Sequence, residues 1–142
     1  MTRLVLDTNV LIGDAYDRGS ASHRIVSSCL GGRLVPVVSP PLLDEYEYIL
    51  PRAIRVPGWR VRFEGLLAHA MRVEPTPIPP VVAEDPSDDI LFATAVAGGA
   101  IAIVSNDRPV LRVGEYRGIR VVRPGDFVAE ADGASRPPGG SH

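Results

Sequence analysis

The sequence predicts an α/β fold: a three-layer α/β/α domain with a central, mainly parallel sheet. Short apolar runs alternate with longer segments in which apolar residues recur at helical spacing. Strands that are separated by helices are joined by right-handed crossovers, which give a parallel sheet covered on both faces. With 142 residues, 45% of them hydrophobic, the chain suits one compact domain with its own core.

The first half of the chain is expected to contribute two strands and four helices. Pro40 and Pro41 favour the start of a helix, because the first helical turn needs no backbone N–H donors. The expected strands are Leu4–Leu6 and Leu34–Val38, and the expected helices lie near Val10–Tyr16, Ser22–Leu30, Pro40–Leu50 and Trp59–Met71.

The second half begins with a proline-rich segment, 75–80, which cannot form a helix or a central strand and is expected to be an extended connector. We then expect a helix at Ile90–Ala97 closed by two glycines, and strands at Ala100–Val104 and Ile119–Val122. A short helix should start at Pro124, with Phe127 packing on the core. The predicted domain spans 1–130, and the Gly, Pro and Ser of 131–142 predict a disordered tail.

The composition excludes several chemistries. All 15 basic side chains are arginines, so any mechanism that needs a lysine is excluded. The single cysteine, Cys29, can form no internal disulfide and has no metal-site spacing, so we expect it in the core. No apolar run reaches the length of a membrane span and no signal peptide is evident, so a cytoplasmic protein is the expectation.

Arginines concentrate in one stretch that contains Arg52, Arg55, Arg60 and Arg62. Guanidinium groups bind phosphates with two hydrogen bonds, so the stretch could contact a nucleic acid. A solvated helix face explains the same pattern equally well.

Acidic residues follow three of the expected strands. Asp7 ends the first apolar run, Asp44 and Glu45 lie just beyond the second, and Asp107 follows Val104. The carboxyl ends of parallel strands line the crevice where ligands bind, so these acids are candidate metal ligands. Helix capping is the alternative for Asp7, because Asp and Asn are good N-caps.

A third acidic cluster, Glu84–Asp89, is the densest in carboxylates. Capping accounts for Asp85 before Pro86, and Asp88 and Asp89 would suit the positive end of a helix dipole. Carboxylates crowded into one turn also repel each other, and a cation would stabilise them. If the fold brings this turn near Asp7, it contributes a ligand.

Four motifs together resemble the PIN-domain ribonucleases in order and spacing, and within them the VapC-like toxin components of bacterial toxin–antitoxin modules. The resemblance covers about 4–127 and rests on Asp7-Thr8-Asn9-Val10-Leu11, Ser39-Pro40-Pro41-Leu42-Leu43-Asp44-Glu45, Asp85-Pro86-Ser87-Asp88-Asp89 with Ala93-Thr94-Ala95, and Ile103-Val104-Ser105-Asn106-Asp107.

The resemblance implies a PIN-like fold and a set of four site acids, each expected to be catalytic and to bind metal: Asp7, Glu45, Asp88 and Asp107. Asn9 and Ser105 match polar positions that assist the metal site. Asp85 and Asp89 stay alternatives for the third acid, and Asp44 for the second. Carboxylate ligands without nearby His or Cys favour Mg²⁺ or Mn²⁺.

The implied activity is hydrolysis of RNA phosphodiester bonds, which would leave a 3′-hydroxyl and a 5′-phosphate. The implied partners are an RNA substrate, a cognate antitoxin and a second copy of the chain in a homodimer, with no membrane. The alternative is a catalytically silent PIN-like module that binds RNA or a protein. Phosphoryl transfer of the haloacid dehalogenase type fits poorly because Asn9 stands where it needs an acid, and a response-regulator receiver needs a lysine.

Overall fold

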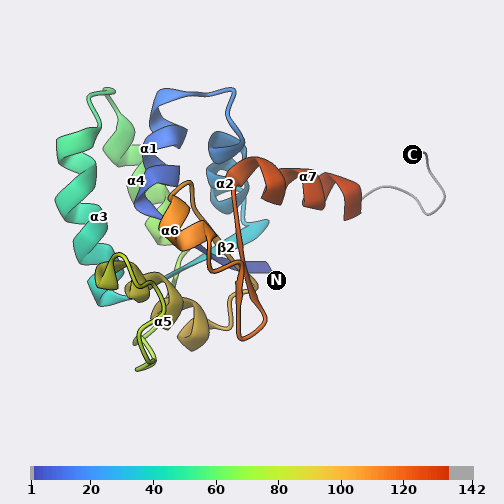
Figure 1. The fold of residues 1–142 in the computed structure, drawn as a ribbon. Coiled ribbons are helices and arrows are strands. Elements are labelled where there is room, and N and C mark those ends of the chain that lie inside the picture. Colours follow the sequence, from blue (N-terminus) through green and yellow to red (C-terminus); the bar gives the residue numbers. More distant parts are fainter. Residues whose placement is uncertain (1, 135–142) are drawn as a thin grey trace.

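A computed structural model describes residues 2–134 and shows a six-stranded sheet with helices on both faces, as the sequence predicts (Figure 1). The strands are β1 (Thr2–Leu6), β2 (Leu34–Val38), β3 (Met71–Arg72), β4 (Ala102–Val104), β5 (Glu115–Tyr116) and β6 (Ile119–Val122). The helices are α1 (Thr8–Tyr16), α2 (Ala21–Leu30), α3 (Pro40–Ala53), α4 (Trp59–Ala68), α5 (Asp89–Gly98), α6 (Arg108–Leu111) and α7 (Pro124–Ala134), with a short 3₁₀ helix, η1 (Pro86–Asp88).

The sheet has the strand order β3-β2-β1-β4-β6-β5, and every neighbouring pair except β5 and β6 is parallel. The chain leaves β1 for β2 on one side and later returns to β4 on the other. This reversal of direction places a crevice at the carboxyl ends of β1 and β4. Leu6 lies opposite Val104, so Asp7 and Ser105 leave the sheet side by side.

The core is centred on β1, whose residues Leu4, Val5 and Leu6 are at most 1% exposed. Helix α5 packs across β1, β2 and β4, while α2 packs on β2 and contacts α1, as Figure 1 shows on the two sides of the sheet. Cys29 is fully buried in α2, as expected. These layers hold the carboxyl ends of the strands as a rigid platform.

Several elements differ from the expected boundaries. The helix from Trp59 ends at Ala68, because Met71 and Arg72 pair with Val37 and Val38 as the edge strand β3. Helix α3 continues to Ala53, beyond the expected end at Leu50. The short elements η1, α6 and β5 were not predicted.

The C-terminal helix starts at Pro124 as predicted, and Phe127 packs against the core. The helix runs to Ala134, so 131–134, the first part of the predicted tail, are helical. The rest of that tail, 135–142, lies outside the described residues. Within residues 2–134, every helix is too short or too polar to cross a membrane.

Candidate active site

Asp7 is held rigidly at the junction of β1 and α1. Its Oδ1 accepts a hydrogen bond from the Thr8 amide at 2.8 Å, so it caps α1, and Oδ2 accepts from Ser105 Oγ at 2.7 Å and Asn9 Nδ2 at 3.2 Å. The residue is 6% exposed. Burial raises the pKa of Asp7, opposed by these hydrogen bonds, while the charge of Asp107 raises it further. The capping and the functional interpretations of Asp7 are therefore compatible.

The loops after β1 and β4 are joined by polar side chains. Ser105 Oγ donates to Asp7 and accepts from the Asp107 amide at 3.0 Å, and the Asn9 side-chain oxygen accepts from the Asn106 amide at 3.1 Å. Ser105 is fully buried. These bonds hold the loop that carries Asp107 next to Asp7. Asn9 and Ser105, the two residues that the resemblance implies as assisting the site, form these bonds.

Glu45 reaches the same site from the second turn of α3. Thr8 Oγ1 donates to Glu45 Oε2 at 3.0 Å, and burial, together with the charges of Asp7 and Asp85, raises the pKa of Glu45. The alternative, Asp44, is exposed on the same helix and forms no hydrogen bond or ion pair with the residues described. The structure thus brings Glu45, and not Asp44, to Asp7.

Asp88 completes the cluster from the end of η1. Burial raises its pKa from 3.8 to about 7, and the charges of Asp7, Asp85 and Asp107 add to the shift. Within residues 2–134, its Oδ2 is the one buried side-chain oxygen or nitrogen with no hydrogen-bond partner. A buried carboxylate oxygen without a partner is costly, so this atom is available for a ligand.

The two alternatives for the third acid have other contacts. Asp85 is exposed, and its Oδ1 accepts from the amide and hydroxyl of Ser87, so it caps η1 at the margin of the cluster. Asp89 Oδ1 accepts from the amides of Val81 and Val82 at 3.1 and 2.8 Å, which ties the proline-rich connector to α5. The geometry therefore favours Asp88.

The four acids Asp7, Glu45, Asp88 and Asp107 have no cationic partner: none of the ion pairs among residues 2–134 includes any of them. Their mutual repulsion and the free Oδ2 of Asp88 fit a hard divalent cation, because the donor set consists of carboxylate oxygens. In the described part of the chain, however, no three His, Cys, Asp or Glu side chains are already arranged around a metal position.

The structure also reveals residues that the sequence reasoning missed. Thr8 orients Glu45, Asn106 binds Asn9 through its amide, and Tyr46 donates its hydroxyl proton to the Leu6 carbonyl from a buried position beside Glu45. Thr8 follows Asp7 and Asn106 precedes Asp107 in the predicted motifs. This adjacency in the sequence was the only feature that could have marked them as site residues.

The arginine-rich stretch does not form one basic surface. Arg62 is half-buried and binds Asp14 through Nε and Nη2 at 3.0 and 2.9 Å. Arg60 pairs with Glu47, and Arg52 lies over the Tyr48 ring. Most of these guanidinium groups thus have partners in the protein, and the solvated-face interpretation of the stretch fits better.

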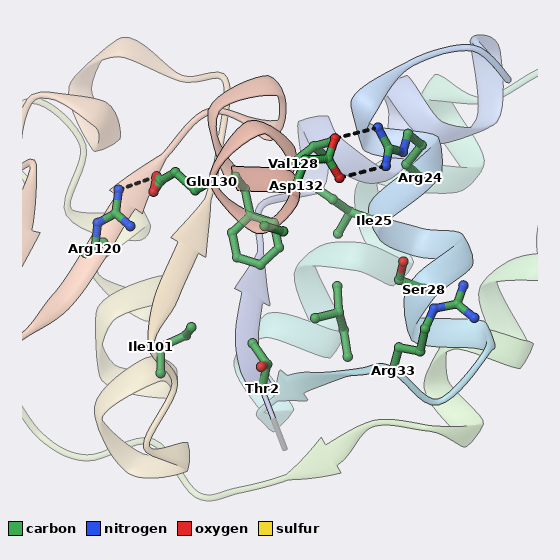
Figure 2. A pocket seen from close by; sticks show the side chains of 13 residues that line it. Thr2, Arg24, Ile25, Ser28, Arg33, Ile101, Arg120, Val128, Glu130 and Asp132 are labelled. Carbon is green, nitrogen blue, oxygen red and sulfur yellow. Dashed lines mark hydrogen bonds and ion pairs between the residues drawn. The ribbon is translucent and has the colours of Figure 1, made fainter. Parts of the chain in front are cut away.

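A hollow of about 390 Å³ lies at the opposite end of the sheet, where Thr2 begins β1 and Ile101 precedes β4 (Figure 2). Figure 2 shows an ion pair on either side of it, Arg24 with Asp132 and Arg120 with Glu130. None of the four acids lines this hollow, so it is separate from the candidate site.

Comparison with known proteins identifies the family. The model of the PIN domain matches residues 3–109. In fold, the chain is similar to VapBC2 from Rickettsia felis, solved bound to a DNA fragment from their promoter, with a TM-score of 0.55 and 12% identity over 84% of this chain and 97% of that one. It is also similar to PAE2754 from Pyrobaculum aerophilum, with a TM-score of 0.55 and 18% identity over 92% of this chain and 90% of that one. No curated protein matches. Because the family model covers most of the sequence, the chain belongs to the PIN domain family.

Proposed function

We propose that this protein is an endoribonuclease that uses Mg²⁺ or Mn²⁺ to hydrolyse RNA phosphodiester bonds, leaving a 3′-hydroxyl and a 5′-phosphate. Membership of the PIN domain family supports a nuclease. The observation that carries the proposal is the meeting of Asp7, Glu45 and Asp88 with Asp107 at the carboxyl ends of β1 and β4, without a cationic partner among the described residues.

In this proposal, the cation would be held by the carboxylate oxygens of the four acids. A bound Mg²⁺ or Mn²⁺ would stabilise charge on the phosphate and make water a stronger nucleophile. Ser105 and Asn9 keep the Asp7 carboxylate in one orientation, and Thr8 does the same for Glu45. Such fixed orientation reduces the reorganisation that the reaction requires.

Among the four acids, Asp88 is the one that keeps a proton closest to neutral pH when no cation is bound. Its pKa of about 7 belongs to the metal-free site, and a cation bound to the carboxylate would lower that pKa and displace the proton. Its Oδ2 is buried and has no hydrogen-bond partner among the described residues, which suits a cation ligand.

The test is cleavage of a mixed panel of structured and single-stranded RNAs in Mg²⁺ or Mn²⁺, with and without EDTA. We expect Asp7→Asn and Glu45→Gln each to reduce the rate at least about 100-fold, because each removes a charge from the site. The matched control Asp44→Asn lies on the same helix, is exposed, and should retain activity. A folded wild-type protein that binds RNA but cuts none of the panel would overturn the proposal and favour the silent binding module.

We further propose that the nuclease is the toxin of a toxin–antitoxin module, with a cognate antitoxin and a homodimer as its assembly. The similarity in fold to the VapBC2 structure supports this extension. A short reading frame beside this gene should encode a protein that co-purifies with the chain and abolishes RNA cleavage. Light scattering should give the mass of a dimer for the chain alone. The mass of a monomer would contradict the homodimer, and the absence of a neighbouring reading frame would contradict the antitoxin.

A further inference from the structure

A groove lined by prolines is formed by residues of α3, the connector, η1 and α5. Its volume is about 350 Å³, within the range of small-molecule pockets. Its apolar walls include Pro41 of α3, Pro75 and Pro77 of the connector, Pro86 of η1 and Ile90 of α5. We call it the proline groove.

The proline groove shares two elements with the candidate active site, although none of the four acids lines it. Pro41 precedes Glu45 by one helical turn on α3, so both side chains lie on the same face of that helix. Pro86 begins η1 and Asp88 ends it. The groove and the cluster therefore lie on the same two elements, α3 and η1, so a nucleotide next to the cleaved bond is the group most easily placed in the groove.

The lining of the groove also includes two polar side chains, those of Asp89 and Thr76. Asp89 lines it, and while its Oδ1 accepts from the amides of Val81 and Val82, its Oδ2 has no hydrogen-bond partner within residues 2–134. The Thr76 amide donates to the Ala93 carbonyl at 3.1 Å, and the Thr76 hydroxyl, in the same described region, forms no hydrogen bond. Flat apolar walls together with a carboxylate and a hydroxyl group suit a planar group that carries N–H donors.

We propose that the proline groove binds the nucleobase next to the cleaved phosphodiester bond and prefers a base with an exocyclic amino group. This inference rests on the proposed ribonuclease function. Single-stranded RNA is recognised through unstacked bases that pack on flat side chains and form hydrogen bonds along their edges. The Asp89 carboxylate accepts an amino proton of adenine, cytosine or guanine, whereas the two carbonyl oxygens of uracil flank its single N–H and are repelled.

The substitution Asp89→Asn tests the role of the carboxylate and keeps its hydrogen bonds to the connector. The amide oxygen of the substituted side chain can still accept from Val81 and Val82, and this requirement points the new NH₂ group to the position of Oδ2. A donor then replaces an acceptor in the groove. We expect the base preference at one position flanking the cut to shift toward uracil about tenfold.

The experiment digests a randomised single-stranded RNA with wild type, Asp89→Asn and Asp44→Asn, and sequences the ends of the products. Wild type and Asp44→Asn should disfavour uracil at the same flanking position, and Asp89→Asn should lose that discrimination while other positions keep their preferences. Equal base frequencies for wild type and Asp89→Asn would overturn the inference. Urea unfolding of each variant confirms that the fold is retained.

A binding measurement keeps this inference separate from the proposed activity. Fluorescently labelled homopolymers of adenosine, cytidine and uridine are titrated into Asp7→Asn, with and without Asp89→Asn. If the uridine polymer binds more weakly than the others and Asp89→Asn reverses this difference, the groove is supported. This holds even if the wild-type protein cuts no RNA, a result that would refute the nuclease alone. Cleavage without any effect of Asp89→Asn on base frequencies or affinity refutes the groove alone.

Discussion

Asp88 makes the folded protein sensitive to pH. Burial and three neighbouring acids raise its pKa from 3.8 to about 7, so between these values the folded state keeps a proton that the unfolded state has lost. The stabilisation is complete below pH 4 and is lost as the pH rises through 7. Asp7 and Glu45 shift in the same direction.

We therefore expect metal-free wild-type protein to lose stability between pH 4 and pH 7, and Asp88→Asn to lose less. Above pH 7 the variant should be more stable by about 1–2 kcal/mol, a figure reduced from the full pKa shift because Asp88 is partly solvated. Urea unfolding in EDTA across this pH range measures the difference. The exposed Asp44→Asn serves as the charge control, and parallel pH profiles for wild type and Asp88→Asn would contradict the expectation.

Single residues also show what the sequence could and could not predict. Asp85, Asp88 and Asp89 all suit the start of a helix, so local preferences do not distinguish them. Their different roles come from tertiary neighbours: Ser87 for Asp85, the connector amides for Asp89 and the other acids for Asp88. Asp7 stood out because it directly ends an apolar strand, whereas the choice of Glu45 over its neighbour Asp44 came only from the resemblance to the PIN-domain motifs.

Among the elements, α1, α2 and α4 are joined by one half-buried arginine. Arg62 of α4 binds Asp14 of α1 and donates to Ser27 Oγ of α2 at 2.8 Å, and Asp14 is 7% exposed. His23 Nδ1 also lies 3.0 Å from Asp14 Oδ1. Removing the guanidinium group would leave the Asp14 carboxylate buried without its main cation.

Arg62→Met should lower the free energy of unfolding by about 3–5 kcal/mol, because it leaves a buried charge uncompensated. Arg60→Met is the matched control on the same helix, since Arg60 pairs with Glu47 in an exposed position and should cost less than about 1 kcal/mol. Urea unfolding measures both. Equal losses for the two variants would show that the Asp14 pair does not join the helices.

A second contact between elements depends on a glycine at the end of α5. A Cβ on Gly98 would lie 2.3 Å from Val37 Cγ1 of β2, so Gly98→Ala must displace helix or strand and should cost about 1–3 kcal/mol. Gly125→Ala, where no atom lies within 4 Å, should be neutral or stabilising by up to about 1 kcal/mol. Thermal unfolding compares the two variants. If Gly98→Ala leaves the Tm unchanged, α5 and β2 are not in close contact at this point.

The long elements were predictable because they repeat a pattern, and the short ones were not. Helix α5 ends in two glycines, and Gly99 takes the left-handed conformation that closes it. In contrast, β3 and β5 contain two residues each, too few to show any alternation. Their strand character comes from pairing with Val37 and with Ile119, which only the folded chain provides.

At the scale of the molecule, the fold brings together acids that are distant in the sequence. Asp7 and Asp107 follow adjacent parallel strands, Glu45 comes from α3 and Asp88 from η1. The order of strands was not predictable, because many orders satisfy the same alternation of strand and helix. The nearness of Asp7 and Asp107 follows from parallel strands that end at the same edge, whereas the approach of Asp88 depends on how the connector and η1 fold back.

This gathering destabilises the metal-free protein and should make its stability depend on divalent cations. A cation that binds only the folded state raises the free energy of unfolding by about 2.7 kcal/mol at a concentration 100 times its Kd. We expect Mg²⁺ or Mn²⁺ to raise the Tm more at pH 8 than at pH 5, because protons on Asp88, Asp7 and Glu45 compete with the metal. Thermal unfolding with metal or with EDTA measures the effect, and Asp7→Asn should abolish most of it while Asp44→Asn retains it. A Tm that is the same in metal and in EDTA at both pH values would show that the four acids do not hold a cation. The repulsion between the acids would then have to be relieved by another partner, such as a cationic side chain of a second protein.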